Sequence, residues 1–100
     1  MSFLMVMNHY VEQHKIALIA SLEIVLMFMG NEKYNLIVSK LNALHNISIR
    51  ECYEHPEYLK PILKEVYQED YAFVISEVKA RLEELIDDND LAHFFKVMES

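Results

Sequence analysis

Three side chains in the middle of the chain come closest to a set that could perform chemistry. They are His45, Cys52 and His55. A thiolate and imidazoles are ligands that suit zinc, and Cys52 and His55 are about one helical turn apart. A fourth ligand is missing, and the nearby Glu51 and Glu54 give little support because carboxylates are plentiful here. We therefore predict no metal site, with a semi-buried cysteine and two surface or capping histidines.

The sequence also offers little for catalysis. A nucleophilic Cys52 would need a histidine held beside it and oxyanion donors, and closeness in sequence does not supply these. Carboxylate pairs such as Glu83/Glu84 are better explained as solvated helix faces. Glycine-rich phosphate loops, paired CxxC motifs and GxSxG elbows are absent from the sequence. We predict a protein that is not an enzyme and has no catalytic residues and no cofactor.

Composition limits the fold class. A chain of 100 residues has room for one domain, and its 53% hydrophobic residues exclude a disordered chain. One glycine and two prolines are too few for the tight turns of a sandwich or barrel. We predict a single all-α domain over residues 1–100, a compact bundle of four to five helices with a hydrophobic first helix.

Charge and hydropathy restrict the partners and the compartment. The net charge is −7, and residues 51–100 contain five Lys/Arg against thirteen Asp/Glu, which opposes nucleic-acid binding. An acidic half of this kind could attract a basic partner, although helix charges usually form a solvated face. The single cysteine suggests a cytoplasmic protein. The apolar run Ile16–Met29 is too short and too polar for a membrane span of about 20 residues.

Apolar residues spaced by three and four, together with capping signals, predict the helices. An apolar N-terminal extension covers residues 1–8. The expected helices span about 9–29, ended by Gly30 in the left-handed conformation, then 32–45, ended at His45–Asn46, and about 70–87. Ser48 and Glu51 have the spacing of a capping box that opens a single turn at 49–54. The connections are short, so consecutive helices should pack antiparallel.

Two further helices are expected in the second half of the chain. One opens at Pro56, and Pro61 predicts either a kink within it or a true start near Lys60. A short C-terminal helix lies within residues 88–100. Its buried side should carry four residues: Leu91, Phe94, Phe95 and Met98.

The first predicted helix is apolar around almost its whole circumference, and a small bundle cannot enclose that much apolar surface. It either runs through the middle of the fold or docks on another copy of the chain, and core filling is an alternative role for Met27 and Met29. We predict a homodimer and a further, unidentified protein partner. The expected interface residues are Phe3, Leu4, Met5, Val6, Ile24, Val25, Met27, Phe28 and Met29.

A second hypothesis is a helical domain that binds an apolar small molecule between its helices. Four tyrosines lie around the loops and helix junctions, where they could line a pocket or cover an edge of the core. They are Tyr53, Tyr58, Tyr67 and Tyr71.

The order of several short motifs also suggests a family. The first motif is an apolar helix that ends in Met29-Gly30. The second is the segment Lys33-Tyr34-Asn-Leu, followed by His45-Asn-Ile-Ser48. The third is Glu54-His-Pro56-Glu, followed by the helix with Leu63-Lys-Glu-Val-Tyr67 and by a last helix that ends in Leu85-Ile86. In this pattern, residues 14–86 resemble a small archaeal helical family described as a Nitrosopumilus output domain. That family often has glycine at the turn near Gln68. The resemblance implies a helical signalling-output or interaction module, with no active-site residues to carry over.

Overall fold

The computed structural model describes the backbone of residues 3–85 and 91–100, and the side chains of residues 13–83 and 91–100. The described residues form five α-helices and two 3-10 turns, and no strand occurs among them. The α-helices are α1 (Phe3–Phe28), α2 (Asn31–His45), α3 (Pro56–Tyr67), α4 (Tyr71–Leu85) and α5 (Ala92–Glu99). The turns are η1 (Ile49–Tyr53) and η2 (Gln68–Asp70). The all-α prediction is confirmed.

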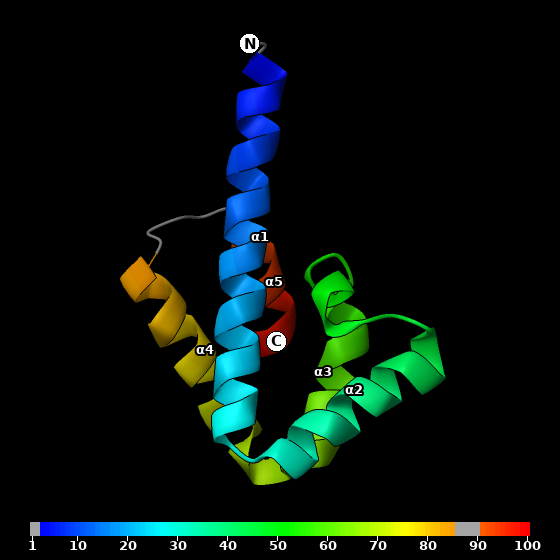
Figure 1. The fold of residues 1–100 in the computed structure, drawn as a ribbon. Helices are drawn as coiled ribbons and strands as arrows, with labels where there is room; N and C mark the ends of the chain where they lie inside the picture. Colours follow the sequence, from blue (N-terminus) through cyan, green and yellow to red (C-terminus); the bar gives the residue numbers. More distant parts are fainter. Residues whose placement is uncertain (1–2, 86–90) are drawn as a thin grey trace.

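The first helix is longer than expected. α1 begins at Phe3, so residues 3–8 continue the helix, and the predicted separate extension over residues 1–8 is wrong for these residues. In Figure 1 this N-terminal part stands beyond the ends of the other helices, while the rest of α1 lies beside α4. α1 packs most extensively against α4 and also contacts α2 and η1. It is not enclosed on all sides, because one of its faces stays exposed.

Gly30 ends the first helix, but not in the expected left-handed helical conformation. Its φ of 128° and ψ of 127° lie in a region open to glycine because it has no Cβ. The Gly30 carbonyl then accepts a hydrogen bond from the Tyr34 amide at 3.1 Å, so the same residue opens α2. As a result α1 and α2 diverge from this turn in Figure 1, and the expected antiparallel packing of consecutive helices is wrong for this pair.

Local signals place the elements in the middle of the chain correctly. Asn46 ends α2 in the left-handed conformation, which asparagine tolerates well. The capping box between Ser48 and Glu51 opens η1, which confirms the expected turn. α3 begins at Pro56 and contains Pro61, so the alternative start near Lys60 is wrong.

The core forms where α1 and α4 meet α3 and the last helix. The residues expected on the inner side of the C-terminal helix, Leu91, Phe94, Phe95 and Met98, are all buried. The buried Tyr71 hydroxyl donates a 2.7 Å hydrogen bond to the Met98 carbonyl, which ties α4 to α5. The predicted end of the helix over 70–87 and the predicted start of the C-terminal helix near residue 88 lie outside the described residues.

Candidate interaction surface

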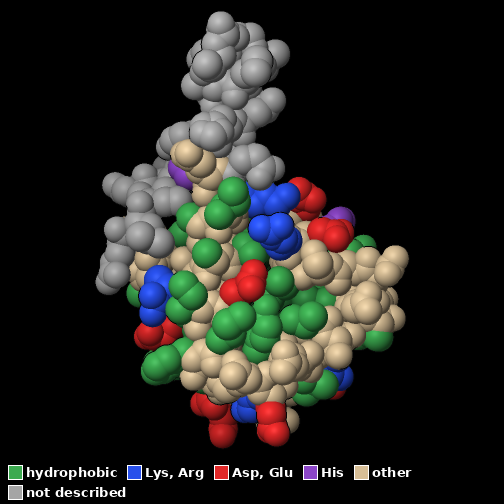
Figure 2. All heavy atoms as spheres, in the orientation of Figure 1, with side chains coloured by type: hydrophobic (Ala, Val, Ile, Leu, Met, Phe, Trp, Pro, Cys, Tyr) green, Lys and Arg blue, Asp and Glu red, His purple; other side chains and the backbone are tan. Residues whose placement is uncertain are grey.

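A line of apolar side chains on the outer face of α1 is the most prominent exposed feature of the described residues. The exposed fractions are 59% for Ile16, 47% for Ile24, 44% for Met27 and 89% for Phe28. Ala20, also exposed, lies between Ile16 and Ile24 at the same four-residue spacing. We call Ile16, Ala20, Ile24, Met27 and Phe28 the α1 stripe. Figure 2 shows hydrophobic side chains over α1 and in the angle between α1 and α2, interrupted by charged ones.

The opposite face of the helix explains why the stripe stays outside. Leu18, Leu22 and Leu26 recur at a spacing of four and are fully buried. With 3.6 residues per turn, this inner face and the stripe point in different directions. The all-round apolar sequence therefore divides into a core face and an exposed face.

The predicted interface residues divide in the same way. Ile24, Met27 and Phe28 are exposed, as a surface role requires, and Met29 is half-buried against the core. Val25 is 5% exposed and belongs to the core, because its helical phase matches that of the buried leucines. Phe3, Leu4, Met5 and Val6 lie on α1, but their side chains lie outside the described set.

Several exposed apolar residues were not predicted. Ile16 and Ala20 belong to the stripe, and the four-residue spacing back from Ile24 would have found them. Phe73 on α4 is exposed, and its position off the apolar stripe of that helix was the available signal. Leu36 and Leu44 are exposed on α2.

A groove of about 320 Å³ runs beside the stripe. It is lined by Lys15, Ile16, Ile19, Ala20, Glu23 and Arg50. The small Ala20 leaves room here, and charged groups border the apolar floor. Lys15 pairs with Glu54 at 3.0 Å, whereas Arg50 forms no ion pair with any described residue. The groove could therefore accept an apolar group next to an acidic one.

The carboxylate of Glu23, at the other side of this groove, contacts α2. It accepts a 3.0 Å hydrogen bond from the Tyr34 hydroxyl. Burial, together with this hydrogen bond and the charge of Glu23, raises the pKa of Tyr34 above its ordinary value. The contact joins α1 to α2 beside the stripe.

The three candidate chemical residues do not meet. Cys52 is fully buried, and its thiol lies 3.9 Å from the Ser48 carbonyl. Burial, with the charges of Glu51 and Glu57, raises the Cys52 pKa to about 12, so the nucleophilic thiolate is strongly disfavoured. Among the described side chains, no three or more His, Cys, Asp or Glu residues are grouped to hold a metal ion.

The two histidines stack on Tyr58 instead. The ring centroids of His45 and Tyr58 are 4.0 Å apart, and those of His55 and Tyr58 are 4.8 Å apart. His55 Nδ1 lies 3.0 Å from the Glu57 carboxylate. Glu57's own backbone amide at the start of α3, and then His55, lower the pKa of Glu57. This arrangement joins the end of α2 to the start of α3.

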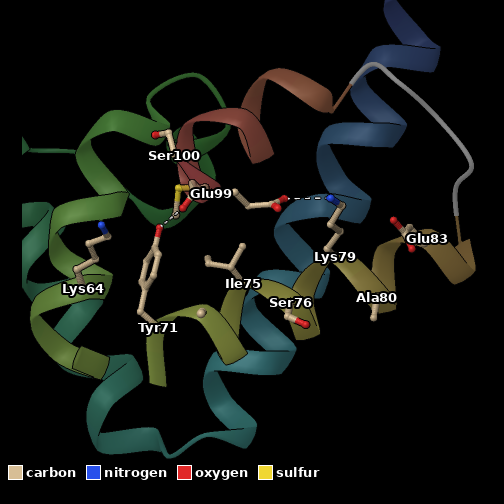
Figure 3. Close-up of a pocket in the computed structure, with 11 residues that line it drawn as sticks. Lys64, Tyr71, Ile75, Ser76, Lys79, Ala80, Glu83, Glu99 and Ser100 are labelled. Carbon is tan, nitrogen blue, oxygen red and sulfur yellow. Dashed lines mark hydrogen bonds and ion pairs between the residues drawn. The ribbon is translucent and has the colours of Figure 1, made fainter. Parts of the chain in front are cut away.

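A second groove, of about 570 Å³, lies between α4 and the end of α5 (Figure 3). Tyr71, Ile75 and Met98 form its apolar floor, and Lys79 pairs with Glu99 at 3.0 Å across it. Lys64 lies at its edge over the Tyr71 ring, with its Nζ 5.4 Å from the centroid. Of the four tyrosines considered above, Tyr71 is the one that lines this groove.

Comparisons with known proteins add no functional assignment. The chain matches no family model, no curated protein and no solved structure. None of the helices in the described part of the chain is long and apolar enough to cross a membrane.

Proposed function

We propose that this protein is a non-enzymatic interaction module that acts as a homodimer, with the α1 stripe as its interface. The observation that carries the proposal is the alignment of Ile16, Ile24, Met27 and Phe28 on one exposed helix face. Large contiguous apolar patches on protein surfaces commonly mark interaction sites. A two-fold dimer, the commonest closed assembly, would cover the same stripe on both copies.

The role of the dimer is signalling output through a further protein partner. The resemblance to the archaeal output-domain family supports this role, and the acidic second half of the chain would attract a partner with a basic surface. The buried, protonated Cys52 thiol supports a function without nucleophilic catalysis. We place the module in the cytoplasm, without nucleic acid, membrane or cofactor.

The dimer is tested by replacing one stripe residue with a charged one. Ile24→Glu places a carboxylate in the interface, where burial without a partner is unfavourable, so the variant should be a monomer by light scattering. Leu44→Glu is the matched control, because Leu44 is 64% exposed on α2, away from the stripe, and this variant should remain a dimer. A wild-type monomer at high micromolar concentration would refute the proposal.

The second candidate function is binding of an apolar small molecule in the groove between α4 and α5. The volume of about 570 Å³ and the floor of Tyr71, Ile75 and Met98 favour it. A thermal-shift screen with apolar metabolites tests this function. A true ligand should raise the melting temperature of the wild type but not that of Ser76→Trp, in which an indole fills the groove.

A further inference from the structure

The groove beside the α1 stripe is basic at one end and acidic at the other. Lys15 pairs with Glu54 directly after η1, so η1 brings Arg50 to the Lys15 end of the groove. Glu23 lies at the other end, about 12 Å further along the helix. Figure 2 shows basic groups side by side next to α1 and a separate acidic group further down. Arg50 is exposed and forms no ion pair with any described residue, so its charge lacks an acidic neighbour.

We infer that a second copy of the chain covers this groove in an antiparallel pair with its two-fold axis at Ala20, so that Glu23 of each copy lies against Arg50 of the other. This inference rests on the proposed homodimer and specifies how the two copies meet. A two-fold interface brings the same patch of both copies together, so the patch must complement itself. A groove with opposite charges at its two ends does so when one copy is turned end for end.

The exposed apolar residues of α1 form one seam centred on Ala20. With about 100° of rotation per residue, Ile16 and Ile24 lie about 40° to either side of Ala20 around the helix axis. Met27 lies about 20° from Ala20, whereas Phe28 lies about 80° away, at the margin of the seam. The small Ala20 side chain lets two helix backbones approach closely at the centre, to the distance of about 8–10 Å at which helices pack.

The symmetry of an antiparallel pair brings the opposite charges together. Its two-fold axis is perpendicular to α1 and to the line that joins the two helices, so each flank stays on its own side while positions along the helix are reversed. Glu23 lies on the groove flank, about 60° around the helix from Ala20 and about 4.5 Å beyond it. In the second copy, Glu23 therefore lies on the same flank but about 4.5 Å before Ala20, near Ile16 and the basic end of the groove. The Tyr34 hydroxyl occupies one acceptor position of the Glu23 carboxylate, and others remain for a guanidinium.

A parallel pair lacks this match. Its two-fold axis runs along α1, so each residue keeps its position along the helix and moves to the opposite flank. The two grooves would then lie on opposite sides of the seam, and Glu23 of one copy would not reach Arg50 of the other. Antiparallel helices also place the positive end of one macrodipole beside the negative end of the other.

Charge reversal at the two ends of the groove tests the facing pair. Glu23→Arg makes both ends basic, and Arg50→Glu makes both ends acidic. In a dimer of either variant alone, like charges would face each other twice, so its dissociation constant should rise about tenfold. In an equimolar mixture the two variants should form a heterodimer with nearly the affinity of the wild type, because both contacts then join opposite charges. Each chain keeps like charges within its own groove, so only contacts between copies explain such a recovery.

Matched controls separate this contact from general effects of charge and folding. Glu77→Arg and Arg81→Glu change the net charge by the same amounts at exposed positions on α4, and both variants should remain dimers. Glu23→Gln removes the charge but keeps an oxygen that can accept the Tyr34 hydrogen bond. Its helical circular dichroism should be unchanged while its dimer weakens, which tests the contact even where Glu23→Arg fails to fold.

Light scattering over a concentration series gives the dissociation constants, and an affinity tag on one variant identifies the heterodimer. A wild-type dimer that the groove variants leave unchanged would overturn the antiparallel contact and leave the homodimer standing. Weakened dimers of both variants without recovery in the mixture would do the same. A monomeric wild type would overturn both the contact and the homodimer.

Discussion

At the scale of single residues, the described chain stores backbone strain at Gln68. Its φ of 51° and ψ of −118° place a non-glycine residue in a sparsely populated region at the end of α3. Gln68→Gly removes the Cβ that makes this conformation unfavourable. Part of the gain is lost because glycine is more flexible in the unfolded chain. We expect the free energy of unfolding to rise by about 0.5–1 kcal/mol in urea denaturation. Gln68→Ala keeps the Cβ, so an equal gain in that variant would contradict the explanation.

The buried Cys52 thiol and the buried Tyr71 hydroxyl predict how the stability of the fold changes at alkaline pH. The pKa values of Cys52 and Tyr71 are raised to about 12 from ordinary values of 9.0 and 10.0, mainly by burial. Above pH 9 the unfolded chain therefore loses protons that the folded chain retains. The contribution of these two groups to the free energy of unfolding is fully present below pH 9, and it is lost as the pH rises towards 12. The free energy of unfolding should fall over this range, less steeply in Cys52→Ala. A profile that stays flat from pH 9 to 12 would contradict this prediction.

At the scale of elements, two buried tyrosines offer a matched test of how α4 and α5 are joined. The Tyr71 hydroxyl bonds to the Met98 carbonyl, whereas the buried Tyr67 hydroxyl has no hydrogen-bond partner among the described residues. Tyr71→Phe should lower the free energy of unfolding by about 1 kcal/mol or more, because it leaves a buried carbonyl unpaired. Tyr67→Phe should be neutral or stabilising. Equal losses in the two variants, measured by urea denaturation, would argue against the contact.

The helices were predictable where local chemistry decides their ends. Pro56, Asn46 and the Ser48–Glu51 capping box each act within one turn, so the sequence alone locates those boundaries. The angle between α1 and α2 was not predictable in this way. It depends on the ψ of Gly30 and on the contact between Glu23 and Tyr34, which forms only when the two helices are in place.

At the scale of the whole molecule, Ile24, Met27 and Phe28 are exposed, as residues of an interface must be, whereas Val25 is buried in the core. A segment that is apolar all round has no polar face to mark its outer side. The partner helices decide its orientation, and the long-range packing of α4 on α1 cannot be read from local spacing. Ile16 and Ala20 could have been found, because they continue the four-residue spacing back from Ile24, which was already predicted to lie at the surface.

Deletion of residues 1–7 tests whether the N-terminal segment contributes to the proposed homodimer. The core residues of α1, from Leu18 to Leu26, lie far along the helix from this segment, so each truncated chain should keep its fold and its helical circular dichroism. The proposed dimer should weaken, because the deletion removes four of the predicted interface residues, Phe3, Leu4, Met5 and Val6. Light scattering over a concentration series should show dissociation at higher protein concentration than for the wild type. If the mass and the melting temperature both stay unchanged, the N-terminal segment has no part in the interface.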